Sequence, residues 1–452
     1  MSVQSLAFLA FLTVTVCVCR LLPKERTWVL LAASLVFYLW GGAPAALWGC
    51  GLLAVSSFVS YLAANTLRKH RRKSVLLAVV CYHIAVLGIF KYTGFFTGGA
   101  VRMPFVPLGI SFFTFQQIWY LREVYAGTFS QVPTPAEYLT YSFFFPTVSS
   151  GPILKPGNFF PQLREASPLP QDTAAGLYAI GLGLAKKVLI ANQVGALWEQ
   201  ISAMSAPTAV TAWLGAIAFT FQIYFDFSGY SDMAIGLGRI FGFRFSENFN
   251  YPYISKSVTE FWRRWHISLS TWFRDYLYFP LGGSRNGNAR TVLSLTVVWF
   301  FTGLWHGASW NFVLWGVMLL GFILLEKFCI GDFLKEHKVL SHVYLLFVIP
   351  QTWVIFRITR LKDVGAYFSR LFPLFGAHSA ISAQDALKLL SSYWWLLLLA
   401  VLAIFFCLPQ PRRFYEKHRG SLLVQLPLFL LFWVCVYFIA TSSGNAFLYS
   451  RF

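Results

Sequence analysis

One histidine of the sequence lies between two apolar stretches, in the segment Gly303-Leu304-Trp305-His306-Gly307. The small residues around it permit close approach of two backbones, and the neighbouring tryptophans can wall a cavity. An ionisable group among apolar helices is costly to bury, so it is usually functional or paired. Burial favours the neutral imidazole, which accepts a proton from a hydroxyl. The pattern predicts a general base, and the alternative is an interfacial histidine held by a backbone carbonyl.

A second histidine, His266, lies in the aromatic and basic segment Glu260–Arg285. The aromatic residues recur at roughly helical spacing, which is typical of an amphipathic helix at a membrane interface. Between Lys256 and Arg290 there are six Lys or Arg and two acidic residues. Such a basic mouth attracts the phosphates of a coenzyme or of a carrier's prosthetic group, whereas the alternative is contact with lipid headgroups. The candidate donor-binding residues of this segment are Arg263, Arg264, Trp265 and Arg274.

Polar residues also gather at the end of an apolar run near residue 226. The candidate residues there are Asp226, Ser228, Tyr230 and Asp232, and beside His306 they are Trp305 and Asn311. One interpretation is the wall of a tunnel that offers a partner to a histidine or to the acyl donor. The other is helix termination with side-chain caps.

Other reactive residue types have simpler interpretations. The seven cysteines are odd in number and lie mostly in apolar runs, without the spacing of a metal site or a disulfide framework. We therefore expect no metal. Asp275 beside Arg274 is expected to form a local ion pair, and His83, in an otherwise apolar run, is expected to be a packing residue.

The composition explains why these residues belong to a membrane protein. Hydrophobic residues make up 57% of the chain and charged residues only 12%, against about 25% charged in soluble domains. The formal net charge is +19. The basic residues lie mainly between apolar runs, where retention of positive loops in the cytosol explains them. We exclude nucleic-acid binding because no basic soluble domain is present to carry it.

About 11 apolar runs are expected to span the bilayer, which needs about 20 apolar residues for each helix. They lie at Val3–Leu22, Trp28–Trp40, Ala45–Ala64, Val75–Phe90, Ala174–Leu189, Thr208–Ile223, Val292–Leu304, Ser309–Leu325, Val343–Phe356, Trp394–Leu408 and Leu422–Ile439. The first run has no basic residues before it and no cleavage site after it, so we expect a retained helix. Basic loops after the first, third and tenth runs predict that both termini are extracytoplasmic, which requires an even number of spans.

Two stretches in the middle are too short or too interrupted to span. Phe105–Trp119 begins among prolines, and Phe143–Leu154 contains Pro146, Gly151 and Pro152. Irregular backbone at membrane depth must be buried in protein, so we expect re-entrant or tilted pieces. Residues Phe243–Arg290 are expected to be a polar and aromatic loop with interfacial helices. We find no repeat and no separable soluble domain, which predicts a single membrane domain over residues 1–452.

The segment Phe261–Arg285, followed by Gly303–Gly307, resembles the membrane-bound O-acyltransferase family. The likeness is to its bacterial branch of alginate O-acetylation and teichoic-acid D-alanyl transfer proteins. Further stretches carry the alginate-type pattern, namely Pro107–Gln116, Tyr224–Ala234, Asn248–Tyr253 and Trp353–Arg357. The resemblance runs from about residue 100 to the C-terminus. This sequence departs from the pattern at Glu123, where aspartate is usual, and at Ala446, where proline is common.

The resemblance implies an all-α fold, a ring of tilted helices around a thinned centre with a tunnel. Residues 1–100 would be N-terminal helices and residues 101–452 the catalytic core. His306 matches the family's intramembrane catalytic histidine, and His266 matches the histidine of its cytosolic-side motif. The implied activity moves an acyl group, as acetyl, from a cytosolic thioester for O-acetylation of an extracytoplasmic polysaccharide. No bound cofactor is implied, since acetyl-CoA or an acyl carrier thioester is the donor substrate.

The remaining expectations concern place and partners. The resemblance implies a multi-pass protein of the bacterial inner membrane and an extracytoplasmic partner of the SGNH acetyltransferase type. Within the same class, the alternative is a D-alanyl transferase for teichoic acid, fed by an acyl carrier protein. From another class, broken segments and intramembrane polar groups are also features of a transporter or flippase.

Overall fold

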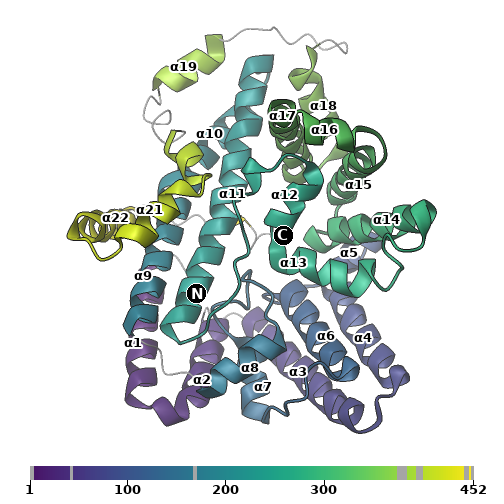
Figure 1. Cartoon of the computed structure of the whole chain (residues 1–452), viewed down its shortest axis with the longest axis vertical. Helices are drawn as coiled ribbons and strands as arrows, with labels where there is room; N and C mark the ends of the chain where they lie inside the picture. Colours follow the sequence, from purple (N-terminus) through teal and green to yellow (C-terminus); the bar gives the residue numbers. More distant parts are fainter. Residues whose placement is uncertain are drawn as a thin grey trace. The chain divides into compact units, whose positions relative to one another are not determined.

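The computed structural model describes residues 5–40, 44–165, 170–373, 384–392, 401–441 and 447–448 of the chain. Each regular element within these ranges is a helix (Figure 1). The predicted all-α class is therefore confirmed. The first part of the predicted run Trp394–Leu408, residues 394–400, and the position Ala446 lie outside the described residues.

Among the described residues, seven helical stretches are long and apolar enough to cross a bilayer. They are Pro44–His70, Lys73–Phe96, Gln171–Ala203, Ala209–Ile240, Trp310–Glu336, Lys338–Arg357 and Leu422–Thr441. The stretches Leu6–Leu21 and Pro23–Leu39, which are bent by 113°, make an eighth if they form one span. The chain is thus a multi-pass membrane protein, and the number of about 11 spans stays a prediction.

The bend separates the first two predicted runs. Helix α1 (Leu6–Leu21) has 16 residues and α2 (Arg26–Leu39) has 14, so at about 1.5 Å per residue each is shorter than a bilayer core of about 30 Å. Pro23 opens the short helix η1 (Pro23–Glu25) between them, where its ring cannot continue α1. The guanidinium of Arg26 then donates to the carbonyl oxygens of Gln162 and Phe241, which fixes the start of α2.

The chain divides into two compact units, each assembled from segments that are distant in sequence. The first comprises residues 1–183, 230–247 and 436–451, and the second comprises residues 184–229, 248–435 and 452. Helix α11 (Ala209–Ile240) contributes to both, changing unit after Gly229. The single membrane domain over residues 1–452 stays a prediction.

The first unit contains a polar network between helices. Besides α1, η1, α2, its part of α11 and the end of α22, its helices are α3 (Pro44–His70), α4 (Lys73–Leu87), η2 (Gly88–Tyr92), α5 (Thr93–Phe96), α6 (Ile110–Ala126), α7 (Pro135–Phe143), α8 (Pro156–Glu165) and most of α9 (Pro170–Ala185). Ser60 Oγ of α3 donates to Gln117 Oε1 of α6 at 2.8 Å and lies 2.6 Å from His83 Nε2 of α4. Since the serine proton is used, His83 donates. Polar side chains often join apolar helices in this way, and the predicted packing role of His83 is confirmed.

The predicted irregular stretch Phe143–Leu154 is buried within the first unit. After Phe143 the helix α7 ends, and the chain continues in turns as far as Gly151. Phe143, Phe144, Phe145 and Leu154 are each at most 4% exposed. Their burial agrees with the rule that backbone outside helices is kept from lipid.

Glu137, outside the spans, supplies a test of stability against pH. Arg164 donates to both of its carboxylate oxygens, at 2.7 and 2.8 Å, and this hydrogen bonding holds the pKa of Glu137 below its usual value. A depressed carboxyl pKa contributes stability above the unfolded-state pKa of about 4.3, and this is lost as pH falls. We expect Glu137→Gln to be about 1 kcal/mol less stable at pH 7. The difference from wild type should vanish near pH 3, as measured by thermal unfolding in detergent, and a difference constant with pH would contradict this account.

The second unit holds the two predicted histidines. Its helices, besides its part of α11, are η3 (Lys186–Ala191), α10 (Asn192–Ala203), η4 (Pro252–Ile254), α12 (Val258–Arg264), α13 (Ile267–Phe273), η5 (Arg274–Tyr278), α14 (Gly287–His306), α15 (Trp310–Leu325), η6 (Glu326–Ile330), α16 (Gly331–Glu336), α17 (Lys338–Arg357), α18 (Leu361–Leu371), α19 (Gln384–Ser392), α21 (Gln410–His418) and most of α22 (Leu422–Thr441). Helices α14 and α15 pack against each other, with close approach at Gly303 and Gly316, and α17 packs on α15.

Candidate functional site

His306 is the last residue of α14 and lies in a box of aromatic rings. Its side chain is 2% exposed. The ring centroid lies 5.0 Å from that of Trp305, 5.0 Å from Trp315 of α15 and 5.2 Å from Phe356 of α17, all three approached edge-on. Three helices therefore converge on the predicted base. The box excludes bulk water from the imidazole.

Two glycines bring α14 and α15 close enough to form this box. A methyl group built on Gly303 of α14 would overlap the carbonyl oxygen of Phe312, and one on Gly316 of α15 would overlap that of Trp299. A β-carbon at either position would push the helices apart. The predicted role of small residues beside the histidine is confirmed.

Asn311 joins the start of α15 to the end of α17. Its side-chain nitrogen donates to the carbonyl oxygens of Ile355 and Phe356, at 3.1 Å each. Asn311 is fully buried, so these contacts are well shielded from water. This predicted site residue thus fixes Phe356, which in turn contacts His306.

His266 occupies a sharp turn between α12 and α13. Its backbone has φ 46° and ψ 54°, the left-handed region that a non-glycine residue adopts only when its surroundings require it. Asn248 holds the backbone in this conformation. Its side-chain oxygen accepts from the backbone N–H and the hydroxyl of Ser268, at 3.0 Å each, and lies 3.3 Å from His266 Nδ1. The turn is thus held by one buried amide.

The two histidines both contact the ring of the same tryptophan. The ring of Trp305 lies 5.7 Å from that of His266 and 5.0 Å from that of His306. His266 is fully buried, and burial lowers its pKa to about 3. Its imidazole is therefore neutral throughout the physiological range. The structure therefore brings the predicted residue His266 together with Trp305 and His306, about 40 positions later in the sequence.

Glu326 fixes the segment that leads to His266. This buried carboxylate, at the start of η6, accepts from the backbone N–H of Thr259 at 2.9 Å, from its hydroxyl at 2.7 Å and from the N–H of Val258. An acidic group at a helix N-terminus satisfies free N–H groups and complements the helix dipole. Glu326 therefore anchors the start of α12, and the turn at His266 follows the other end of this helix.

The aromatic side chains of α12 point into the protein. We expected an amphipathic helix at the membrane interface, whereas Glu260–Arg285 forms two short helices and a π-helical turn. Trp262 packs between Trp299 and Trp315, at 5.1 and 5.4 Å, and Trp265 lies 4.8 Å from Trp353. The turn at His266 divides the segment that was expected to be one helix. Trp262 and Trp265 thereby reach the aromatic residues around His306.

The basic candidates of this segment lie at its surface and do not converge. Arg263 is exposed. Arg264 pairs with Glu260 at 2.9 Å, one helical turn away. Arg274 pairs with Asp275 at 2.8 Å, which confirms the predicted local ion pair. Donor binding by these arginines stays a prediction.

Asp226, on α11, forms an ion pair within the helical interior. Its side chain is 1% exposed and lies 2.5 Å from Lys187 Nζ of η3, which is 3% exposed. The next residue, Phe227, packs edge-on against His266 at 4.7 Å. Ser228 is also buried. The pair therefore fixes the part of α11 that contacts the His266 turn.

Tyr230 and Asp232 continue α11 into the first unit. The hydroxyl of Tyr230 lies 2.5 Å from Ser149 Oγ, and its ring lies 5.1 Å from that of Phe447. The structure therefore assigns the predicted polar cluster to two units: Asp226 and Ser228 to the unit of the histidines, and Tyr230 and Asp232 to the other.

Sequence reasoning missed the roles of Lys187, Asn248 and Glu326. Lys187 interrupts an apolar run, and a cation inside such a run is itself a signal of pairing. Asn248 stands in a recognised stretch, but its link to the His266 turn depends on the fold. Glu326 ends an apolar run and gives no sign of its partner at residue 259. Among the described residues, no group of three His, Cys, Asp or Glu side chains is arranged to hold a metal.

Comparison with known proteins adds to this geometry. The model of the membrane-bound O-acyltransferase family matches residues 45–338. The probable alginate O-acetylase AlgI of Azotobacter vinelandii is 38% identical over 369 residues, covering 77% of this chain and 73% of that protein. The peptidoglycan O-acetyltransferase of Helicobacter pylori is 28% identical, covering 96% and 92%. The teichoic acid D-alanyltransferase of Bacillus subtilis is 29% identical over 218 residues, covering 46% and 55%. All three relatives are named for acyl transfer.

Proposed function

The chain belongs to the membrane-bound O-acyltransferase family, and from this premise we propose that it moves an acetyl group from a cytosolic thioester for O-acetylation of an extracytoplasmic polysaccharide. It is a multi-pass O-acyltransferase, and this family membership favours the enzyme over the transporter or flippase hypothesis. The proposed donor is acetyl-CoA. The proposed location is the bacterial inner membrane, with both termini outside and residues 1–452 forming one membrane domain.

The proposed base is His306. The neutral imidazole takes the proton of the acceptor hydroxyl while the hydroxyl oxygen attacks the thioester carbonyl carbon. The carbon–sulfur bond then breaks, and the imidazolium returns the proton to the thiolate, giving an ester and a free thiol. General-base catalysis of this kind typically contributes about 10²- to 10⁴-fold. No nucleophile on the enzyme is needed.

One observation carries this proposal: the burial of His306 among Trp305, Trp315 and Phe356. Aromatic walls keep water from competing with the acceptor hydroxyl and hold the thioester and hydroxyl in a dry site. The neutral ring of His266, which also contacts Trp305, supports a second role at the same place. We propose that His266 orients the acyl group rather than removing a proton.

The remaining candidates are proposed to guide substrates. Arg263, Arg264 and Arg274 would attract the phosphates of the donor at the basic mouth. Asp226 and Ser228 are proposed to line a passage within the unit of the histidines, with Asn311 and Trp265 holding its walls, and Tyr230 and Asp232 are proposed to contact substrate within the other unit. A chain made mostly of apolar helices offers little extracytoplasmic surface for binding a polymer. We therefore propose an extracytoplasmic acetyltransferase partner of the SGNH type.

Reconstituted protein with radiolabelled acetyl-CoA tests the choice of donor. We expect release of free CoA thiol that requires the wild-type protein and a hydroxylated acceptor. The His306→Ala variant, prepared and reconstituted in the same way, is the negative control for thiol release. Thiol release without acceptor would indicate hydrolysis, and absence of release with any acceptor would contradict the acetyl-CoA proposal.

The second candidate is D-alanyl transfer from a charged carrier protein. It is supported by the likeness to the Bacillus subtilis teichoic acid D-alanyltransferase, which covers 46% of the chain. In the same reconstituted system, a D-alanyl carrier that donates where acetyl-CoA does not would establish this alternative.

A further inference from the structure

Indole N–H groups near His306 are not used by the proposed base. In the described part of the chain, the side-chain nitrogens of Trp262, Trp265 and Trp315 are buried and have no hydrogen-bond acceptor. The three side chains are at most 8% exposed. A buried indole N–H usually donates a hydrogen bond, because leaving it without an acceptor costs free energy. Three such donors beside the proposed base therefore indicate an acceptor atom on a molecule that binds there.

Two other buried tryptophans of this chain do have an acceptor. Trp353, which packs 5.9 Å from Trp315, donates to the hydroxyl of Tyr253 at 3.2 Å. Trp119, in the first unit, donates to Glu123 Oε1 at 2.9 Å. Each is 1% exposed. The fold thus supplies acceptors to tryptophans that serve packing, and the three unpaired donors stand apart from that pattern.

Trp315 is the donor among the three whose ring packs directly on His306. The two ring centroids lie 5.0 Å apart, with the planes at 88°. Further rings pack on Trp315 at 5.2 to 6.4 Å, namely those of Trp262, Trp299, Trp353 and Phe356. An indole nitrogen is a donor only, and a phenyl ring has no polar atom. None of these four rings therefore competes for the N–H of Trp315, which is left to a molecule bound beside His306.

Acyl transfer creates a strong acceptor atom beside the base. As the substrate hydroxyl attacks the thioester, the π electrons of the carbonyl bond move to its oxygen, which becomes an oxyanion. The double bond re-forms when the carbon–sulfur bond breaks. A donor that is fixed in advance in a site without bulk water stabilises this charge. The attacked carbon is bonded both to the incoming oxygen and to the oxyanion, so the donor must lie close to His306.

We propose that the indole N–H of Trp315 donates a hydrogen bond to the carbonyl oxygen of the acyl thioester and stabilises the oxyanion that forms there. This inference rests on the proposed function, since it adds a second catalytic group to the reaction in which His306 is the base. The indole keeps its proton throughout, while His306 takes the proton of the hydroxyl and returns it to the thiolate. The two groups act on the two oxygens of one intermediate, where Gly303 and Gly316 bring α14 and α15 together.

Replacement of Trp315 by the tryptophan analogue benzothienylalanine tests the donor, because sulfur takes the place of the N–H in a ring of nearly the same shape. We expect kcat to fall about 10²- to 10³-fold, while KM for the thioester stays close to that of the wild-type protein. Trp315→Phe, which also lacks the N–H, should lose at least as much. The measurement is thiol release by the reconstituted full-length protein, with whichever of acetyl-CoA and the D-alanyl carrier thioester the wild-type protein uses.

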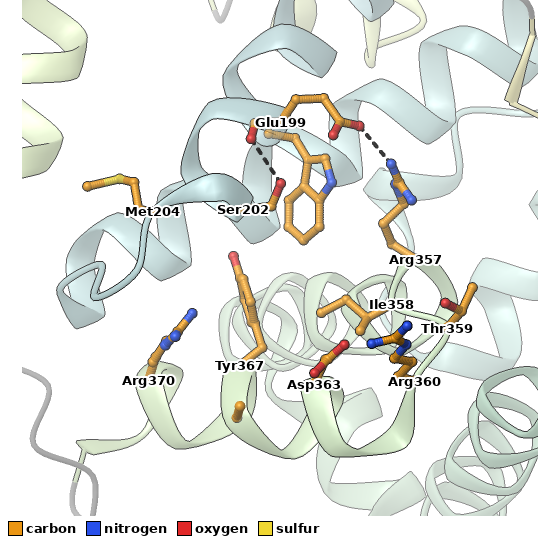
Figure 2. A pocket seen from close by; sticks show the side chains of 12 residues that line it. Glu199, Ser202, Met204, Arg357, Ile358, Thr359, Arg360, Asp363, Tyr367 and Arg370 are labelled. Atoms are coloured by element: carbon orange, nitrogen blue, oxygen red, sulfur yellow. Dashed lines mark hydrogen bonds and ion pairs between the residues drawn. The ribbon is translucent and has the colours of Figure 1, made fainter.

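The matched control makes the same exchange at Trp198 of α10. This side chain is 2% exposed and packs on Phe219 and Tyr367, at 5.3 and 5.5 Å. It lines the polar pocket between α10, α17 and α18 that Figure 2 shows, and it belongs to the same unit as Trp315. The analogue at this position should leave kcat as in the wild-type protein. Equal losses at the two positions would show that the analogue acts through packing.

Infrared spectroscopy of the bound thioester separates this inference from the choice of base. In His306→Ala protein the isotopically labelled thioester should stay intact, and its carbonyl stretch should lie at lower frequency than in an apolar solvent, because a hydrogen bond weakens the carbonyl bond. Replacing Trp315 as well should raise that frequency. Turnover that survives His306→Ala would reject the base and leave the kcat test of Trp315 standing. A wild-type kcat without the indole N–H, or a carbonyl frequency that does not respond to its removal, would each overturn the assignment.

Discussion

Replacement of His306 by alanine is expected to lower the rate of acyl transfer by about 10²- to 10⁴-fold, while the protein still inserts and folds. The reason is that the imidazole, which lies in the aromatic box of Trp305, Trp315 and Phe356, is the proposed proton acceptor. The measurement is thiol release from acetyl-CoA under saturating acceptor. The loss should fall on kcat rather than on KM for the donor, because the base acts in the transition state.

Two further variants make this result interpretable. His306→Gln fills more of the box than alanine does and cannot act as a base, so it should be equally inactive with less loss of stability. His418→Ala removes a half-exposed histidine on α21 and should keep wild-type activity. Substantial turnover by His306→Gln would show that another group takes the proton.

Replacement of Lys187 by methionine is expected to destabilise the protein by about 3–5 kcal/mol, because it leaves the carboxylate of Asp226 buried without its cation. The pair lies at 2.5 Å with both side chains at most 3% exposed. Unfolding in a mixture of mild detergent and sodium dodecyl sulfate measures the effect. The loss should extend to activity, since Phe227 beside Asp226 packs against His266.

Removing both charges distinguishes a lost pair from a lost contact. The double variant Lys187→Met with Asp226→Leu should recover most of the stability, since a well-packed apolar pair can replace a buried ion pair. Arg412→Met breaks an exposed pair with Glu416 on α21 and should cost at most about 0.5 kcal/mol. A single variant as stable as wild type would show that Asp226 is neutralised by other means.

Much of this molecule follows from local sequence. Hydropathy is a property of a continuous stretch, so the membrane class and most helices were predictable. The position of His306 at a helix end followed from the glycines around it, and the ion pair of Arg274 with Asp275 from their adjacency. Each of these depends on neighbours within a few residues.

What the sequence concealed are contacts between distant helices. Asn311 bonds to residues 44 and 45 positions away, and Glu326 to residues 67 and 68 positions away. Which side chains meet at such separations depends on the rotation and depth of each helix, and apolar composition leaves both open. The bend after α1 was also hidden, because hydropathy reports the length of a run and not its direction. The left-handed turn at His266 is imposed by Asn248, 18 positions earlier.

The contact of Gly303 with Phe312 and of Gly316 with Trp299 has a consequence for how such a protein can change over generations. At both places the hydrogen of glycine is the largest group that the helix crossing admits. Single substitutions at these two glycines are therefore not tolerated, since even alanine would push the two helices apart beside His306. New substrate preferences must instead arise at side chains around the crossing, such as Phe356, whose size can vary while the helices stay in contact.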